Sequence, residues 1–181
     1  MLREIAQIVF AIHMSLAPQQ HFTEKQIKYY AAEIQQAAEK ADVDPLLYVS
    51  IITHESQWNE RAISADHEDY GLMQVRARYY NGGTHPEWLL NPHYNIMIGT
   101  HIINGAREFC RKFLKREPTL QEWMSVYQGS KPSCKPTKLS KIVEDYYQCL
   151  VDRVDVDVED NLFMNCREVY WPVHRVVGKD K

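Results

Sequence analysis

Apolar residues recur every three or four positions through much of the chain, a spacing that predicts α-helices rather than strands. Near the amino terminus this spacing is followed by Ile5, Ile8, Val9, Ile12 and Leu16. The same stretch resembles the apolar part of a short signal peptide, but Glu4, Gln7 and His13 interrupt it. We therefore favour an amphipathic helix that packs on the core over a cleaved signal.

Helix start signals recur farther along the chain. Capping boxes and N-cap residues followed by proline stand at Thr23 with Gln26, Thr119 with Glu122, Asp44 with Pro45, and Asn91 with Pro92. These signals and the apolar spacing predict helices over residues 24–40, 46–58, 92–115, 119–127 and 142–150. Polar or proline-containing stretches at 59–71 and 131–138 are predicted to be loops.

The chain changes character after Leu150. Valines alternate with charged residues over 151–159, and residues 168–177 are rich in strand-forming types. The pattern predicts a β-prone tail, residues 151–181, attached to a mainly α domain that spans residues 1–150. A chain of 181 residues is long enough for one such domain and its tail.

Composition excludes some classes of function. A formal net charge of −3 provides no concentrated basic surface for phosphates, so nucleic acid is not an expected partner. No apolar run approaches the ~20 residues that a membrane-spanning helix requires. An adaptor that binds nucleic acid is therefore the weakest of the functions considered.

The cysteines and histidines show no metal-ligand spacing. His54 with Glu55 resembles the start of the zinc-protease pattern His-Glu-x-x-His, but position 58 is Trp. We therefore predict no metal and no cofactor. Cysteines stand at positions 110, 134, 149 and 166, which allows three disulfide connectivities. Because little indicates export, the sequence favours a reduced set.

One carboxylate interrupts an otherwise apolar helix face. Leu47, Ile51 and Glu55 are spaced by four, with Trp58 three residues later, so they share one side of the predicted helix. Burial disfavours the charged form of a carboxyl group and raises its pKa. A rise of about two units would make Glu55 a competent general acid near neutral pH. The alternative is a solvated glutamate in the last helical turn.

Three short segments in a fixed order carry a family resemblance. They are His54-Glu55-Ser56, the run Gly71-Leu72-Met73-Gln74-Val75, and Val126-Tyr127-Gln128. Together they resemble the Glu-Ser, Gly-Leu-Met-Gln and Ala-Tyr-Asn segments of the lytic transglycosylases, which belong to the lysozyme-like superfamily and are related to goose-type lysozyme. Asn95 also resembles a residue on the helix that packs behind the site in that family. The third segment, with the two residues that follow it, departs from the family pattern at Gln128 and Ser130.

The resemblance implies a role for each matched residue. Glu55 would be the catalytic acid and then base, and the Tyr127 hydroxyl would lie near its carboxyl group. Substrate-binding roles would fall to Ser56, Gly71, Met73, Gln74 and Gln128, with Gly71 allowing close approach of the backbone to the glycan. The implied reaction cleaves the MurNAc–GlcNAc β-1,4 bond of peptidoglycan glycan strands and leaves a 1,6-anhydro product.

Two alternatives stay open. A goose-type muramidase would use an Asp to activate water, and Asp66, Glu68 and Asp69 lie in the loop where such a residue could sit. A structural component of a virion or secretion machine could instead keep the fold without the activity. Because the family is mostly exported and a convincing signal is missing here, we expect action on the cell wall in the periplasm after delivery by such an assembly, with the tail docking to a partner.

Overall fold

The structure is a computed structural model that describes residues 2–17, 19–129, 133–154 and 166. The helices of this part are α1 (Leu2–Ser15), α2 (Glu24–Ala41), α3 (Pro45–Glu55), α4 (Pro92–Leu114), α5 (Leu120–Tyr127) and α6 (Lys138–Val154). Two short strands, β1 (Asp69–Tyr70) and β2 (Val75–Arg76), form an antiparallel hairpin. Three 3₁₀ helices follow the hairpin: η1 (Ala77–Tyr79), η2 (Asn81–Gly83) and η3 (Pro86–Leu90). The expected mainly α, lysozyme-like class is confirmed.

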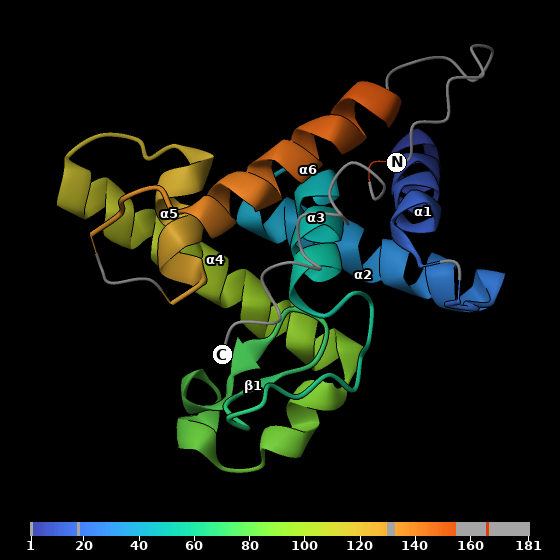
Figure 1. Ribbon diagram of the computed structural model, residues 1–181, viewed down its shortest axis with the longest axis horizontal. Helices are drawn as coiled ribbons and strands as arrows, with labels where there is room; N and C mark the ends of the chain where they lie inside the picture. Colours follow the sequence, from blue (N-terminus) through green and yellow to red (C-terminus); the bar gives the residue numbers. More distant parts are fainter. Residues whose placement is uncertain (1, 18, 130–132, 155–165, 167–181) are drawn as a thin grey trace.

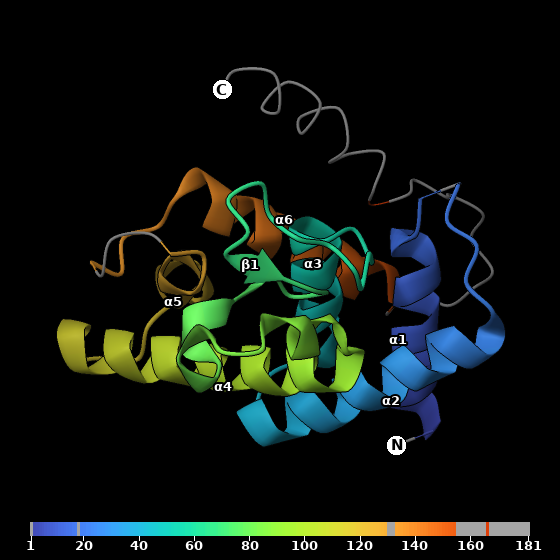
Figure 2. The ribbon, with the colours of Figure 1, turned by 90° about the horizontal axis from the view of Figure 1, so that it is seen from below.

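Helix α3 lies at the centre of the molecule, and other helices surround it (Figures 1 and 2). It packs against α1, α2 and α6, so nearly every side chain from Leu46 to Thr53 is buried. The predicted packing of the first helix is confirmed, since Ile8, Ala11 and Ile12 of α1 are fully buried. The hairpin and the 3₁₀ helices gather with the start of α4 in a lobe at the carboxyl end of α3 (Figure 1).

The capping signals form the predicted hydrogen bonds. Thr23 and Thr119 each complete a capping box, with Gln26 and Glu122 respectively. The Asp44 side chain accepts from the backbone N–H of Leu46 and starts α3. An N-cap of this kind contributes about 1 kcal/mol to stability. Local sequence therefore fixes the starts of these helices.

The end of α3 differs from the prediction. The helix stops at Glu55 rather than near Trp58, because Gln57 and Trp58 adopt left-handed backbone angles with φ of 54° and 66°. The Trp58 indole then folds back, and its Nε1 donates to Thr53 Oγ1 at 2.9 Å. Trp58 is therefore a core residue beside the helix, and Glu55 ends the helix where the chain turns into the lobe.

The segments on either side of the helical core also differ from the prediction. The stretch predicted as a loop over 59–71 includes β1, which pairs with β2. Helix α6 continues to Val154, so the first residues of the alternating valine stretch are helical, and Val151 and Val154 pack against the core. The rest of the β-prone tail lies outside the described residues, except Cys166.

The prediction of reduced cysteines is wrong. Cys110 is bonded to Cys134, and Cys149 is bonded to Cys166. Spacing could not reveal these pairs because each joins segments that meet only in the folded chain. The first bridge joins α4 to the segment before α6, and the second ties the chain beyond residue 150 back to α6.

Candidate active site

A groove of about 590 Å³ runs between the end of α3, the hairpin lobe, α4 and the end of α5. Glu55 and Gln128 line it, together with Asp69 and Arg76 of the hairpin. Further walls come from His54, Gln74, Val75, Arg78, Tyr79, His101, Ile102, Gly105, Ala106, Val126, Tyr127, Gly129 and Leu139. The groove therefore brings together residues from all three matched segments.

Glu55 occupies the last position of α3 and is partly buried. Leu47 and Ile51, on the same face, are almost completely buried, as their spacing predicts. Burial raises the pKa of Glu55 from 4.5 to about 7, while a hydrogen bond from Gln128 lowers it and the charge of Asp69 raises it further. A carboxyl group with this pKa is available in both protonation states near neutral pH. Glu55 can therefore donate a proton and later accept one.

Gln128 is the side chain that hydrogen-bonds to this carboxyl group. Its Nε2 donates to Glu55 Oε1 at 3.4 Å, a long hydrogen bond. Its other amide atom, Oε1, is buried and accepts no hydrogen bond from the described residues. A buried acceptor without a partner costs free energy, so such an atom calls for a functional explanation. The position at which the sequence departs from the family pattern thus lies directly beside the candidate acid.

Tyr127 forms a hydrogen bond with the backbone of the segment that links β1 to β2. Its hydroxyl donates to the backbone carbonyl of Met73 at 2.8 Å rather than to Glu55. Burial, followed by the charge of Glu55, raises the pKa of this hydroxyl well above 10.0, so it stays a neutral donor. Tyr127 therefore links the end of α5 to the segment after the first hairpin strand, beside the groove.

Residues 71–73 are held from behind by one asparagine. Asn95 of α4 is fully buried. Its Oδ1 accepts from the Met73 backbone N–H at 2.7 Å, and its Nδ2 donates to the carbonyls of Tyr70 and Leu89 at 2.7 and 2.8 Å. The expected place of Asn95 behind the site agrees with these contacts. A single side chain thus fixes the path of the segment that links β1 to β2.

Gly71 and Met73 serve packing rather than lining the groove. A Cβ on Gly71 would lie 2.3 Å from the Leu89 carbonyl oxygen and 2.4 Å from Asn95 Nδ2, and its φ is +74°. The close approach expected of Gly71 is thus to α4 and η3. Met73 is fully buried, and its Sδ would lie 2.5 Å from a Cβ on Gly99 of α4.

Ser56 and Gln74 complete the matched segments. The Ser56 hydroxyl donates to the Ile52 carbonyl at 3.2 Å, and the residue is nearly buried at the end of α3, outside the residues that line the groove. Gln74 does line the groove, with a left-handed φ of 46°. Its Nε2 donates to the carbonyls of Gly71 and Ala62 at 3.0 and 3.3 Å. Of the five expected substrate-binding residues, Gln74 and Gln128 thus face the groove.

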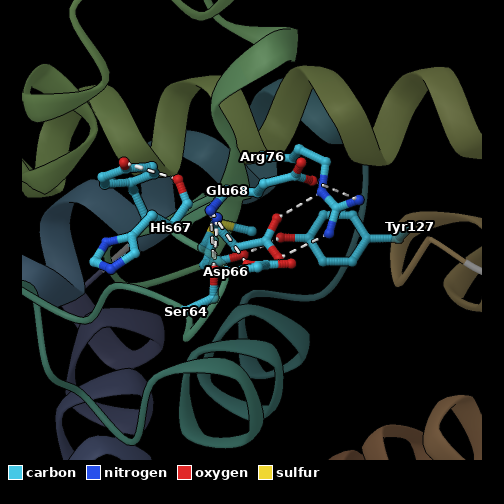
Figure 3. A network of polar contacts seen from close by, with 9 residues as sticks. Ser64, Asp66, His67, Glu68, Arg76 and Tyr127 are labelled. Carbon is cyan, nitrogen blue, oxygen red and sulfur yellow. Dashed lines mark hydrogen bonds and ion pairs between the residues drawn. The ribbon is translucent and has the colours of Figure 1, made fainter.

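The three loop carboxylates have different surroundings. Asp69 lines the groove, and both of its oxygens accept from Arg76, from Nε at 2.9 Å and from the terminal nitrogen at 3.0 Å. Glu68 also pairs with Arg76, at 3.2 Å. Asp66 is exposed and accepts from Ser64 Oγ and the Glu68 backbone. Figure 3 shows Arg76 among these carboxylates, with the Tyr127 ring close to it. Asp69 is therefore the loop carboxylate that faces Glu55, and Arg76 neutralises it.

Several groove residues could not be predicted from the sequence. Arg76, Arg78 and Tyr79 follow the Gly-Leu-Met-Gln segment without a recognisable motif, and His101 lies on the outer side of α4. A hairpin of two-residue strands leaves too little alternation to show which side chains face the groove. The described part of the chain contains no group of three or more potential metal ligands. It also contains no helix long and apolar enough to cross a membrane.

A comparison with protein families gives one match. The model of the transglycosylase SLT domain matches residues 32–124, from the middle of α2 into α5, so Glu55, the hairpin and Asn95 lie inside the match. Tyr127 and Gln128 lie just beyond its end. No curated protein and no solved structure matches the chain significantly. Because the match covers just over half of the sequence, the chain belongs to the transglycosylase SLT domain family, which places it in general among the lytic transglycosylases that cleave peptidoglycan.

Proposed function

We propose that Glu55 is the catalytic acid and base that cleaves the MurNAc–GlcNAc β-1,4 bond of peptidoglycan. The observation that carries this proposal is a carboxyl group with a pKa of about 7 on the wall of a groove. One residue that serves as acid and then as base needs a pKa near the working pH, which burial supplies here.

The first half of the reaction uses the protonated form. Glu55 donates its proton to the glycosidic oxygen, the bond between that oxygen and C1 of the MurNAc sugar breaks, and the GlcNAc portion leaves with a new hydroxyl group. The carbonyl oxygen of the sugar's own N-acetyl group bonds to C1 and takes up the positive charge. Glu55 is now ionised, and the Nε2 of Gln128 is placed to donate to this carboxylate.

The second half regenerates the acid. The ionised Glu55 accepts the proton of the C6 hydroxyl, O6 attacks C1, and the acetamido oxygen departs. A 1,6-anhydro ring closes, no water is consumed, and Glu55 is protonated again. Both proton transfers thus pass through one carboxyl group, whereas most glycosidases use two.

The surroundings of Asp69 favour the anhydro product over hydrolysis. A goose-type muramidase reaction would need a carboxylate free to accept a proton from water, and Asp69 is the loop carboxylate that lines the groove with Glu55. Both Asp69 oxygens accept hydrogen bonds from Arg76. Arg76 therefore occupies both carboxylate oxygens, and a water molecule would have to compete with the guanidinium for them.

The two disulfides bear on where the enzyme acts. Disulfides form and persist in oxidising compartments such as the bacterial periplasm and are rare in the cytosol. The Cys110–Cys134 and Cys149–Cys166 bridges therefore support action on the cell wall outside the cytoplasm.

The Glu55→Gln variant tests the role of Glu55. It keeps the size and hydrogen-bonding capacity of the side chain but can neither donate nor accept the proton, so we expect a loss of at least about 10²–10⁴-fold in the release of muropeptides. Glu60→Gln is a matched control, because Glu60 does not line the groove and its described hydrogen bond joins it to Tyr30. A Glu55→Gln protein that digests peptidoglycan at the native rate would rule out the proposal.

Mass spectrometry of the released sugars tests the product. We expect 1,6-anhydro ends on the muropeptides released by the native enzyme. If all of the released muropeptides carry reducing ends, the hydrolase alternative holds and Asp69 becomes the expected base.

A further inference from the structure

Arg78 and Tyr79 form an exposed cationic and aromatic pair on the groove wall. Both lie in η1 directly after β2, and both line the groove. Tyr79 is 59% exposed, the highest exposure among the large hydrophobic side chains of the described part. The Arg78 guanidinium carbon lies 5.3 Å from the centre of the Tyr79 ring. This stacking supports the planar guanidinium while its N–H groups remain available to a ligand.

The backbone beneath this pair is anchored to the hairpin. The Ala77 N–H donates to the Glu68 carbonyl at 2.8 Å, and the Tyr80 N–H closes η1 by donating to the Ala77 carbonyl at 2.9 Å. These contacts fix the start and the end of the turn that carries the pair. The pair is thus presented by an ordered turn, so its geometry is set before a ligand arrives.

The charge of Arg78 is not balanced inside the groove. Arg76, two residues earlier, pairs with Asp69 and Glu68. Among the described residues, no ion pair joins Arg78 to a carboxylate. The groove carboxylates are Asp69, which Arg76 neutralises, and Glu55, whose raised pKa leaves it largely protonated below about pH 7. Within the described part of the chain, the Arg78 guanidinium therefore has no carboxylate partner and is available to a ligand in the groove.

An arginine stacked on an aromatic ring is well suited to bind a carboxylate. The guanidinium fork matches a carboxylate with two parallel hydrogen bonds, and the Tyr ring offers an apolar face to the carbons beside it. In peptidoglycan the sugar rings are uncharged. A muramic sugar without a peptide stem carries a free lactyl carboxylate, whereas in a stem-bearing sugar that carboxyl is an amide and the carboxylates belong to the stem. We propose that Arg78 and Tyr79 bind one of these carboxylates, so that the groove selects glycan strands whose muramic sugars carry acidic substituents. This inference rests on the proposed function of the groove.

Binding measurements in the Glu55→Gln background test the site without turnover. The ligands are glycan oligomers of equal length in three forms: with peptide stems, with stems removed to leave the lactyl carboxylate, and chitooligosaccharides, which carry no carboxylate. We expect Arg78→Gln to weaken binding of at least one of the two carboxylate-bearing forms by about tenfold or more and to leave the chitooligosaccharides unchanged. Arg78→Lys should recover part of the loss, because it keeps the charge but not the fork.

The stem-free form identifies the source of the carboxylate. If Arg78→Gln weakens only the stem-free form, in which the lactyl carboxylate is free, Arg78 binds that carboxylate; if it weakens only the stem-bearing form, Arg78 binds a carboxylate of the stem; if it weakens both, the site accepts either carboxylate. Arg61→Gln, which removes an exposed arginine outside the groove lining, is the matched control and should change none of the three affinities.

Two outcomes would overturn the site: equal weakening of all three ligands by Arg78→Gln, or no weakening of any. Either result would leave the catalytic proposal intact, because the role of Glu55 is measured separately by muropeptide release.

Discussion

Two of the segments that carry the family resemblance meet beside Glu55, but they contribute in different ways. In residues 71–73, Gly71 and Met73 face α4, where Asn95 and Gly99 hold them. At the end of α5, Tyr127 and Gln128 face the groove, and Gln128 reaches the candidate acid. The first part of the more recognisable motif thus serves packing, with Gln74 at its end facing the groove, whereas Gln128, which departs from the family pattern, hydrogen-bonds to the candidate acid. A recognisable sequence motif can therefore be required for packing as well as for contact with substrate.

Gly71→Ala should give the largest effect and would sharpen this contrast. A Cβ there overlaps the Leu89 backbone and the Asn95 side chain, and the left-handed φ adds strain. We expect a loss of about 3 kcal/mol or more in the free energy of unfolding, measured by urea denaturation. Gly82→Ala is the matched control, because Gly82 also has positive φ but a Cβ there meets nothing within 4 Å. Equal effects of the two substitutions would contradict the close-packing role of Gly71.

The difference in stability between the Glu55→Gln variant and the native protein should depend on pH. The pKa of Glu55 is 4.5 unperturbed and about 7 in the folded protein, so between these values the folded state holds a proton that the unfolded state has released. Native stability therefore falls as pH rises through this window, by about 3 kcal/mol in all. Thermal and urea unfolding should show Glu55→Gln matching the native protein near pH 4 and exceeding it above pH 7. A constant difference across this range would mean that the pKa of Glu55 is not raised.

Gln128→Met should change catalysis with little change in stability. The methionine fills similar space but cannot donate to Glu55, so the ionised form loses a stabilising contact and the pKa of Glu55 rises. We expect the rate to fall by up to about tenfold and the high-pH limb of the activity profile to move to higher pH. Gln121→Met is the matched control on α5, because the Gln121 amide donates to Glu144 away from the groove. An unshifted pH profile would mean that Gln128 does not influence the pKa of Glu55.

Tyr127→Phe should have the smallest effect and tests the link between the two segments. The ring stays in place, and the lost hydrogen bond to the Met73 carbonyl is expected to reduce the free energy of unfolding by about 1 kcal/mol. Because the hydroxyl does not hydrogen-bond to Glu55, the pH profile should keep its position. A shifted profile, measured beside the stability, would show that Tyr127 acts on Glu55 directly.

Sequence alone predicted most of the fold because helix starts are local. The capping hydrogen bonds of Thr23 and Thr119 join residues three positions apart, so a short window contains all of the information needed. The end of α3 could not be found in this way. Its left-handed turn at Gln57 and Trp58 follows from the burial of the Trp58 indole against Thr53, and nothing in the adjacent sequence announces it.

The part of the candidate site that lies on one face of a single helix could be predicted from the sequence. Leu47 and Ile51 mark the buried face that ends in Glu55, and this much follows from helical spacing. Which of Gly71, Met73 and Gln74 faces the substrate depends on the rotation of a turn that α4 imposes. The pairing of Asp69 with Arg76 depends on a hairpin too short to leave a pattern. Tertiary contacts decide both features.

The Cys110–Cys134 bridge has a consequence for the timing of activity. It closes a loop of 24 residues that contains all of α5, the helix whose end supplies the groove with Tyr127 and Gln128. In the chain-entropy view, such a closure stabilises the fold by about 3–4 kcal/mol. A chain with reduced cysteines lacks this contribution, so the end of α5 is then held by packing and by the hydrogen bonds of Tyr127 and Gln128. Formation of the bridge in an oxidising compartment would hold this wall of the groove more firmly in place.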